Sequence, residues 1–161
     1  PSGLGHLQKG HGTAFADLDA DGDLDVFAQM GGAFRSDLFH NACFENPGFG
    51  NRWLAVRLEG RQSNRSALGA RIRAVIVEGG KQRSVYRTIS SGGSFGANPL
   101  RAHLGLGQAE KIESLEVFWP KTGKTQVFRD VPLDRYLEIV EGEERFEAHE
   151  LHPVKLGGGA R

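Results

Sequence analysis

Cysteine is almost missing from this chain of 161 residues, because Cys43 is the only one. A single thiol cannot form a disulfide within the chain, so a disulfide-stapled scaffold is excluded. Long hydrophobic runs are missing too, since no apolar stretch approaches the roughly 20 residues that a membrane-spanning helix needs. We therefore expect no membrane insertion. The chain has no N-terminal signal peptide and begins at Pro1 without methionine, which indicates a processed chain or a piece of a longer one.

Catalytic motifs are also missing. No G-x-S-x-G nucleophile elbow surrounds Ser66 or Ser94, no phosphate-binding loop is present, and Cys43 has no evident histidine partner. We therefore expect that the protein is not an enzyme. We expect no nucleic acid partner either, because the arginines of the middle segment alternate with apolar residues and lack an accompanying aromatic cluster.

The formal net charge is zero, but the charges are unevenly distributed along the chain. Residues 1–51 carry 2 basic and 7 acidic side chains, residues 52–109 carry 10 and 2, and residues 110–161 carry 8 and 11. Such alternation is compatible with attraction between the acidic part of one copy and the basic part of another. It is equally compatible with an ordinary mixed surface after folding.

Aspartates stand at every second position in one short segment, called the aspartate loop below: Asp17, Asp19, Asp21, Asp23 and Asp25. Carboxylates this close repel one another unless a cation neutralises them. Calcium accepts six to eight oxygen ligands in flexible geometry. We expect side-chain oxygens from the first three aspartates, the backbone carbonyl of Asp23 and the carboxylate of Asp25, with Gly22 at the sharp turn. The sequence therefore predicts a Ca²⁺ site, and the alternative is a surface turn without metal.

The surroundings of the aspartate loop separate it from an EF-hand. The loop begins like the EF-hand pattern, but Ala28 stands at position twelve, where an EF-hand has a bidentate glutamate. Short β-prone segments flank the loop, Gly12-Thr13-Ala14-Phe15-Ala16 before it and Leu24-Asp25-Val26-Phe27 within and after it. This context resembles one FG-GAP or VCBS repeat. The resemblance implies a calcium loop between two strands of a blade in an integrin-like β-propeller.

The pattern along the chain predicts an all-β fold. Residues 1–50 contain two or three strands, one of them over 37–45, which is too little to bury a core alone. From Trp53 onward, alternating apolar and polar residues predict seven short strands and no amphipathic helix up to residue 141. We expect an antiparallel β-sandwich or barrel at residues 51–142, preceded by a short β-propeller-like repeat at 1–50. A C-terminal tail, 143–161, begins with a predicted helical turn.

An ordered series of motifs in the second region is similar to the ASPIC/UnbV domain. The motifs are Asn51-Arg52-Trp53-Leu54, Ser63-Asn64-Arg65-Ser66-Ala67-Leu68-Gly69-Ala70-Arg71, Ser91-Gly92-Gly93-Ser94-Phe95-Gly96, His103-Leu104-Gly105-Leu106-Gly107 and Val117-Phe118-Trp119-Pro120. The resemblance implies a module that follows FG-GAP or VCBS repeats, as in the cartilage acidic protein family and many secreted bacterial proteins. The family usually has a full propeller before this domain, whereas one repeat is present here.

Several motif residues have both a structural and a functional interpretation. The Asn64-Arg65-Ser66 segment is either a structural network or a binding element, and it is also an N-glycosylation sequon. Gly69 and Gly107 are candidates for turn geometry. The two tryptophans, Trp53 and Trp119, are either core residues or platforms for sugars.

These features favour an extracellular or cell-surface module that is stabilised by calcium and serves in interaction or self-assembly, in a structural or adhesive role. The expected partner is another protein or a second copy, giving a homo-oligomer or a filament, because unpaired strand edges of a short repeat need a cover. The alternative is a carbohydrate-binding module of a secreted protein, in which the Gly-Ser loop, Phe95 and arginines such as Arg101 contact a glycan. A third reading, an accessory role in secondary metabolism, rests only on the UnbV name.

Overall fold

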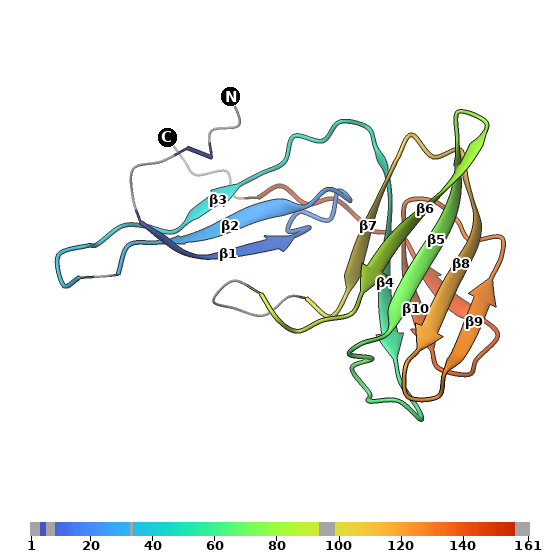
Figure 1. Cartoon of the computed structure of the whole chain (residues 1–161). Coiled ribbons are helices and arrows are strands. Elements are labelled where there is room, and N and C mark those ends of the chain that lie inside the picture. The colour runs from blue at the N-terminus through green and yellow to red at the C-terminus, as the bar shows by residue number, and fades with distance from the viewer. Residues whose placement is uncertain (1–3, 6–8, 33, 94–98, 157–161) are drawn as a thin grey trace. The chain divides into compact units, whose positions relative to one another are not determined.

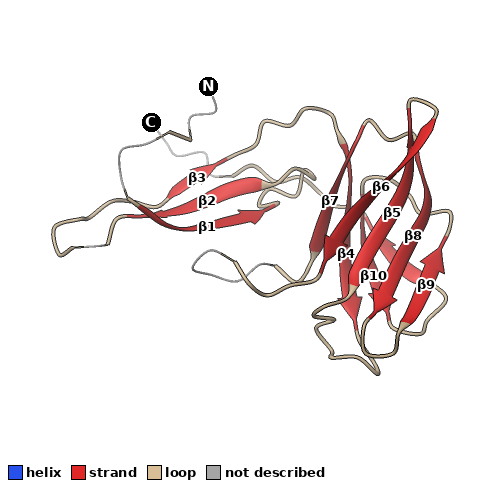
Figure 2. Ribbon diagram, in the orientation of Figure 1, coloured by secondary structure: helices blue, strands red, loops and turns tan. Residues whose placement is uncertain are grey.

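The structure is a computed structural model of the whole chain, and it describes residues 4–5, 9–32, 34–93 and 99–156. All of the regular elements in these residues are β-strands, numbered β1 to β11 in chain order (Figures 1 and 2). The prediction of an all-β fold is therefore confirmed. The part of the chain described here contains no helix that is long and apolar enough to cross a membrane.

The chain divides into two compact units. Unit 1 is built mainly from the residues up to Gly48, together with His152 and the residues that follow it. Unit 2 contains Phe49–Ser91 and Pro99–Leu151. The chain thus leaves unit 1 after the first strands and returns to it at its C-terminal end.

Unit 1 contains one antiparallel sheet of three strands in the order β1-β2-β3. The strands are β1 (Gly10–Ala16), β2 (Asp25–Met30) and β3 (Ala42–Phe44). The strand predicted over 37–45 is thus only three residues long. A turn ends at Asp37, whose N–H donates to the Phe34 carbonyl at 2.9 Å and whose carbonyl accepts Gly32 N–H at 2.8 Å, and residues 38–41 are irregular.

Unit 2 is a sandwich of two four-stranded sheets, in the orders β11-β10-β4-β7 and β6-β5-β8-β9. The strands of the first sheet are β4 (Arg52–Glu59), β7 (Ala102–Gly107), β10 (Arg135–Val140) and β11 (Phe146–His149). Those of the second are β5 (Arg71–Glu78), β6 (Lys81–Thr88), β8 (Lys111–Trp119) and β9 (Lys124–Phe128). Neither sheet closes into a barrel within the described residues, so the sandwich alternative is the one observed.

The core of unit 2 lies between the two sheets. Alternate residues of each strand point into it, as the period of two in the sequence predicts. Its largest fully buried side chains are Trp119, Leu54, Ile72, Ile76, Leu104, Leu106, Leu115, Leu137, Ile139, Val56 and Val117. On β4, the side chains of Leu54, Val56 and Leu58 are buried in this core, whereas Arg57 is exposed.

Two features of the sandwich differ from the prediction. Strand β10 runs parallel to β4, with Leu137 opposite Val56, so the first sheet is mixed and not purely antiparallel. The segment after β10 forms β11, which pairs antiparallel with β10, in place of the predicted helical turn. Packing explains β11, because the ring of Phe146 lies edge-on to Phe128 at 5.8 Å between centroids and contacts the core.

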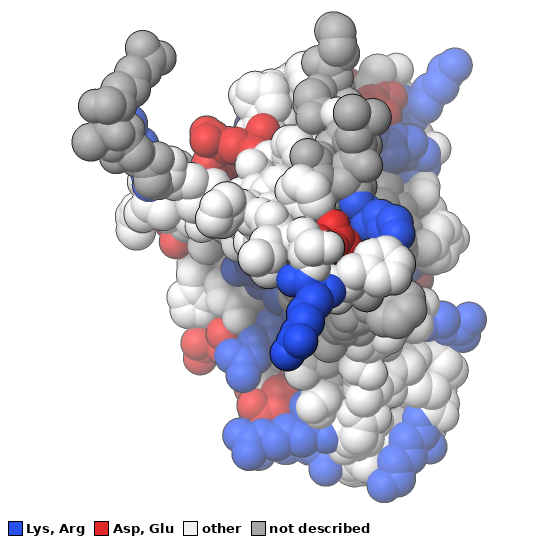
Figure 3. All heavy atoms as spheres, turned by 90° about the vertical axis from the view of Figure 1, so that its left-hand side faces the viewer, with Lys and Arg blue, Asp and Glu red and all other residues white. Residues whose placement is uncertain are grey.

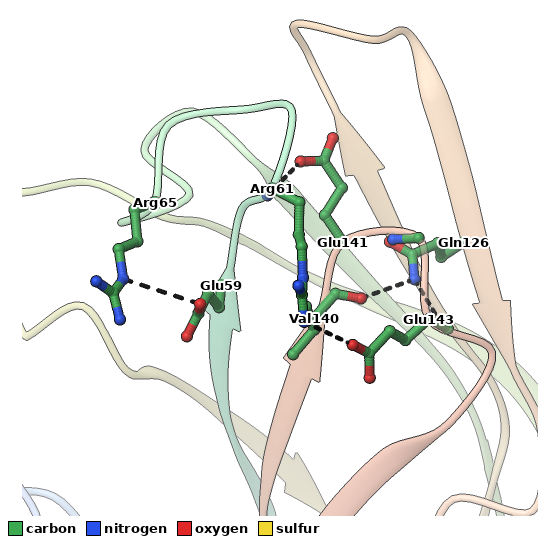
Figure 4. Close-up of polar contacts among 8 residues, drawn as sticks. Glu59, Arg61, Arg65, Gln126, Val140, Glu141 and Glu143 are labelled. Carbon is green, nitrogen blue, oxygen red and sulfur yellow. Dashed lines mark hydrogen bonds and ion pairs between the residues drawn. The ribbon is translucent and has the colours of Figure 1, made fainter.

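Side chains bridge both open seams of the sandwich. At the seam between β6 and β7, Arg87 Nε donates to the His103 carbonyl at 2.9 Å and Arg83 Nη2 donates to the Leu106 carbonyl at 2.8 Å. At the opposite seam, Gln126 of β9 donates to the carbonyls of Val140 (3.2 Å) and Glu143 (2.8 Å) (Figure 4). The two arginine bonds satisfy backbone carbonyls on β7, an edge strand, whereas Gln126 joins β9 to the turn that follows β10.

Replacement of Gln126 by methionine should destabilise unit 2 by about 1–3 kcal/mol, because it leaves buried or half-buried polar groups without partners. Besides its two donated bonds, the Gln126 Oε1 accepts Gly142 N–H at 3.1 Å and the indole N–H of the fully buried Trp119. Urea unfolding followed by tryptophan fluorescence measures the change, since both tryptophans, Trp53 and Trp119, belong to unit 2.

The matched control for this substitution is Gln82→Met. Gln82 is exposed on β6 of the same sheet, so the same chemical change should alter the unfolding midpoint little. Equal effects of the two substitutions would contradict the assigned role of Gln126.

Candidate functional site

The aspartate loop connects β1 to β2, whose last and first residues, Ala16 and Asp25, pair with each other. Two residues of the loop have positive φ, Ala20 at 61° and Gly22 at 97°. Glycine accepts this conformation without a steric penalty, which agrees with the predicted sharp turn at Gly22. The loop is therefore tightly coiled. In an extended strand, side chains at every second position would all lie on one face, and the five carboxylates would repel one another there.

Three of the predicted ligands converge. Carboxylate oxygens of Asp17, Asp19 and Asp21 all lie within 4.8 Å of one another. Asp19 is buried, with 7% of its surface exposed, and its Oδ1 accepts Asp21 N–H at 3.3 Å. The structure therefore brings the side chains of the first, third and fifth loop positions together, as the sequence predicts.

The other two predicted ligands lie outside this group. Asp25 is buried, and its two carboxylate oxygens accept Leu18 N–H at 2.9 Å and Asn46 N–H at 2.8 Å. These bonds tie the start of the loop to the segment after β3. Asp23 N–H donates to Asp21 Oδ1 at 2.8 Å, which fixes the turn. In the structure, Asp25 holds the loop together through backbone amides, a role that its position in the sequence does not indicate.

The electrostatics of the loop favour a cation. Burial is the main cause that raises the pKa of Asp19, the Asp21 N–H opposes it, and the charges of Asp21, Asp25 and Asp17 raise the pKa further. Burial likewise raises the pKa of Asp23, followed by the charges of Asp21 and Asp25. Oxygens within 4.8 Å of one another can all reach one ion at calcium–oxygen distances of about 2.3–2.6 Å. The donors are all oxygens, so these three residues fit a calcium ion.

The C-terminal segment adds a contact to the loop that the sequence does not predict. Val154 N–H donates to the backbone carbonyl of Asp19 at 2.7 Å. Both groups belong to unit 1, although they are far apart in the chain. No sequence motif identifies Val154, because every residue except proline has a backbone N–H that can donate such a bond.

The loop at residues 60–69, called the motif loop below, contains most of the Ser63–Arg71 motif. It is organised by Glu141, which sequence reasoning missed (Figure 4). Glu141 Oε2 accepts the backbone N–H groups of Arg61 (2.8 Å), Gln62 (2.8 Å) and Ser63 (2.7 Å), and Oε1 accepts the Ser63 hydroxyl at 2.9 Å. Burial alone would raise the pKa of Glu141, but these hydrogen bonds outweigh it and lower the pKa to about 2. The carboxylate is thus an ionised structural centre just beyond β10.

The remaining motif residues near this loop also have structural contacts. Asn64 Nδ2 donates to the Leu68 carbonyl at 3.0 Å, and Asn64 Oδ1 accepts Leu68 N–H at 2.8 Å. The amide nitrogen that glycosylation would modify is therefore engaged in the loop. Gly107 has a φ of +62°, which a side chain would strain, and an added Cβ would lie 2.6 Å from Glu78 Oε1, so the Glu78 side chain would have to move.

The two tryptophans differ in their surroundings. Trp119 is fully buried in the core, as the structural interpretation predicts. Trp53 is 9% exposed and lies outside the main core cluster, where its ring stacks on His103 with centroids 6.1 Å apart and planes 14° apart. Neither ring offers an open platform to a sugar. Phe95, the third candidate aromatic, lies outside the described residues.

The uneven charge of the sequence is largely compensated within unit 2. Ion pairs join the basic segment to the acidic one: Arg52–Asp134, Arg57–Glu138, Arg61–Glu143 and Arg73–Glu116. These ion pairs agree with the interpretation of an ordinary mixed surface. The face drawn in Figure 3, the left-hand side of Figure 1, also carries both acidic and basic side chains.

Comparison with known proteins identifies part of the chain. The profile of the family described as ASPIC and UnbV matches residues 60–146, which is more than half of the 161 residues. The match covers the motif loop, Glu141 and the strands from β5 to β10. The aspartate loop lies outside it, so the FG-GAP or VCBS resemblance stays a prediction. A search of curated proteins found no match to this chain.

Protonation of Glu141 should destabilise unit 2 in acid. Since its folded pKa of about 2 lies below the ordinary value of 4.5, its contribution is complete above pH 4.5 and is lost as the pH falls from there toward 2. In Glu141→Gln the free energy of unfolding should drop by about 1–3 kcal/mol at neutral pH, because a charged acceptor of buried amides is lost. Its pH dependence in this window should also flatten, as measured by urea unfolding at a series of pH values.

The control is Glu143→Gln, which changes a neighbouring carboxylate. The side chain of Glu143 is 52% exposed and pairs with Arg61, so its loss should change stability by less than about 1 kcal/mol. If the free energy of unfolding of Glu141→Gln fell with decreasing pH as steeply as that of the wild type, another group would be responsible for the loss of stability in acid.

Proposed function

The chain belongs to the ASPIC and UnbV family, and from this and from the geometry of unit 1 we propose that it is a calcium-stabilised interaction or self-assembly module. Its role in this proposal is structural or adhesive, at the cell surface or in the extracellular medium, and does not include catalysis. Millimolar calcium outside cells is sufficient for loops of moderate affinity. The proposed partner surface is the sheet of unit 1.

The observation that carries the proposal is that this sheet exposes large apolar side chains on both faces. Cross-strand partners share a face, so Phe15 and Val26 lie on one side, and Phe27, opposite Ala14 and Cys43, lies on the other. Phe15 is 55% exposed and Phe27 is 41% exposed. A free sheet normally has one polar face, so two apolar faces favour packing between neighbouring sheets.

The distribution of exposed apolar residues points the same way. Of the thirteen exposed large hydrophobic residues among those described, eight belong to unit 1: Leu4, Phe15, Leu18, Phe27, Phe34, Leu38, Phe39 and Val154. Unit 1 is the smaller unit, and the large buried cluster found among the described residues lies in unit 2. Exposed surface of this kind is typical of a protein-binding site.

Bound calcium would stabilise this surface, because it would neutralise the carboxylates of the aspartate loop at one end of the sheet. Asp17, Asp19 and Asp21 would hold the ion. Asp25 already fastens the loop to the segment after β3 through Leu18 and Asn46. The proposed ion would therefore stabilise the pairing of β1 with β2, on which both apolar faces depend.

Calcium should raise the stability of unit 1 and leave unit 2 unchanged. At a calcium concentration 100 times the dissociation constant, the gain is about 2.7 kcal/mol. Hydrogen exchange should show residues 13–30 opening when EGTA is added, while the strands from β4 to β10 keep their protection. Asp19→Asn and Asp21→Asn should abolish the response, whereas Glu45→Gln, an exposed carboxylate of unit 1, should retain it. Equal protection of residues 13–30 with calcium and with EGTA would contradict the calcium role.

Self-association should depend on both faces of the unit 1 sheet. In sedimentation velocity with calcium, Phe15→Ser and Phe27→Ser should each shift the chain toward the monomer, because each removes an aromatic contact from one face. Phe49→Ser is the control, since Phe49 is 77% exposed but belongs to unit 2. A wild-type chain that stays monomeric at all concentrations would rule out self-assembly, even if calcium binds.

A further inference from the structure

A histidine and two glutamates converge on the outer face of the first sheet of unit 2. Glu138 lies on β10, and Glu147 and His149 lie on β11. One candidate ligand atom from each side chain lies within 4.8 Å of the other two, and His149 Nε2 is 3.9 Å from Glu147 Oε2. Apart from the aspartate loop, no other group of three such side chains in the described residues meets this distance.

The register of β10 with β11 explains why these side chains meet. Glu138 is directly opposite Glu147, and Tyr136 is opposite His149, so all four side chains lie on one face of the strand pair. The alternate residue Leu137 is buried in the core, so the shared face is the solvent side. Binding of an ion by this group would therefore need only rotations of side chains and no movement of the strands.

The pair of opposed glutamates has a cost that a cation would remove. Like charges directly opposite each other on antiparallel strands destabilise the pairing. Arg57 compensates Glu138 in part, since its Nη1 lies 3.6 Å from Glu138 Oε1, whereas the side chain of Glu147 is 80% exposed and has the His149 ring as its neighbour. Strand β11 is an edge strand of four residues, so few other cross-strand pairs offset this repulsion.

Surrounding side chains orient two of the three candidate ligands. Tyr136 O–H donates to Glu138 Oε1 at 2.7 Å, which leaves Oε2 for an ion. The Tyr136 ring also lies against the His149 ring, with centroids 5.6 Å apart and planes tilted by 33°. Arg101 in turn lies over Tyr136, with its central carbon 5.7 Å from the ring centroid. Carboxylates and imidazoles that bind metals are commonly held in this way by neighbouring side chains.

The donor atoms identify the class of ion. Calcium and magnesium prefer ligands that are all oxygen, whereas one imidazole nitrogen with two carboxylates suits zinc, copper and nickel. We propose that Glu138, Glu147 and His149 bind a divalent transition metal ion such as zinc, which fastens β11 to β10. Three protein ligands leave one position of a tetrahedral zinc site open for water. The site belongs to unit 2 and requires neither calcium nor self-association.

The test titrates zinc into the full chain by calorimetry, in excess calcium, which competes for the oxygen ligands of the aspartate loop. The chain should bind zinc under these conditions, and copper more tightly, as the general order of divalent affinities predicts. His149→Ala, Glu138→Gln and Glu147→Gln should each weaken zinc binding by at least about tenfold, the loss that is typical even of residues that only orient a ligand. The matched controls, His152→Ala and Glu150→Gln, change exposed residues that follow the site in the sequence and should leave zinc binding unchanged.

A second measurement separates a metal ligand from a residue that merely supports the fold. Without metal, Glu147→Gln removes the repulsion with Glu138, so its free energy of unfolding should not fall below that of the wild type. With zinc, the same variant should gain less stability than the wild type. Hydrogen exchange should also show that zinc increases the protection of Phe146–His149 in the wild type and not in His149→Ala.

Four results would overturn the proposal. They are the absence of zinc binding, zinc binding that excess calcium abolishes, equal weakening by the control variants, and unchanged protection of β11 when zinc is bound. The second would place the ion at oxygen ligands such as those of the aspartate loop, and the third would show adventitious binding to surface side chains. None of these results bears on calcium-dependent assembly, which is measured on unit 1.

Discussion

Backbone groups at the edges of open sheets must find partners, and the arrangement of unit 2 depends on how this is done. Its two sheets do not close, yet Arg83, Arg87 and Gln126 carry hydrogen bonds across the two seams to β7 and to the end of β10. A side chain that spans a seam fixes both the distance between the sheets and the position of its own charged end. For Arg87 that end is held against the His103 carbonyl of β7.

Unit 1 meets the same constraint differently. Within the described part of the chain, its sheet has three strands and no facing sheet, and Phe15 and Phe27 lie on opposite sides of it. Within unit 1 the loop is tied by backbone hydrogen bonds, since Asp25 accepts two backbone amides and the Asp19 carbonyl accepts Val154 N–H. What is left incompletely buried is apolar surface. Apolar surface, unlike an unpaired polar group, is tolerated until a partner covers it, which is why the interaction surface is proposed for this unit.

Buried carboxylates organise both units through backbone amides. Asp25 closes the aspartate loop, and Glu141 closes the motif loop with three N–H groups on a single oxygen. An ionised carboxylate accepts several such bonds, so one residue can hold a loop that has no regular structure. The family profile ends just beyond Glu141, and its matched residues include both partners of this arrangement. The match therefore contains both the motif loop and the carboxylate that holds it.

The parts of this structure that the sequence predicted are those in which local pattern decides. Alternation of apolar residues located the strands of the sandwich, and the spacing of aspartates brought Asp17, Asp19 and Asp21 together. The parts that were missed depend on contacts between distant segments. Glu141 reads as one more surface charge until the motif loop folds against it, and β11 forms because Phe146 reaches Phe128 across the core. The parallel pairing of β10 with β4 likewise follows from the crossover between sheets, which no local periodicity encodes. The sequence pattern indicates whether a side chain points into the core or toward solvent. Which distant residue it contacts is decided only when the two sheets pack together.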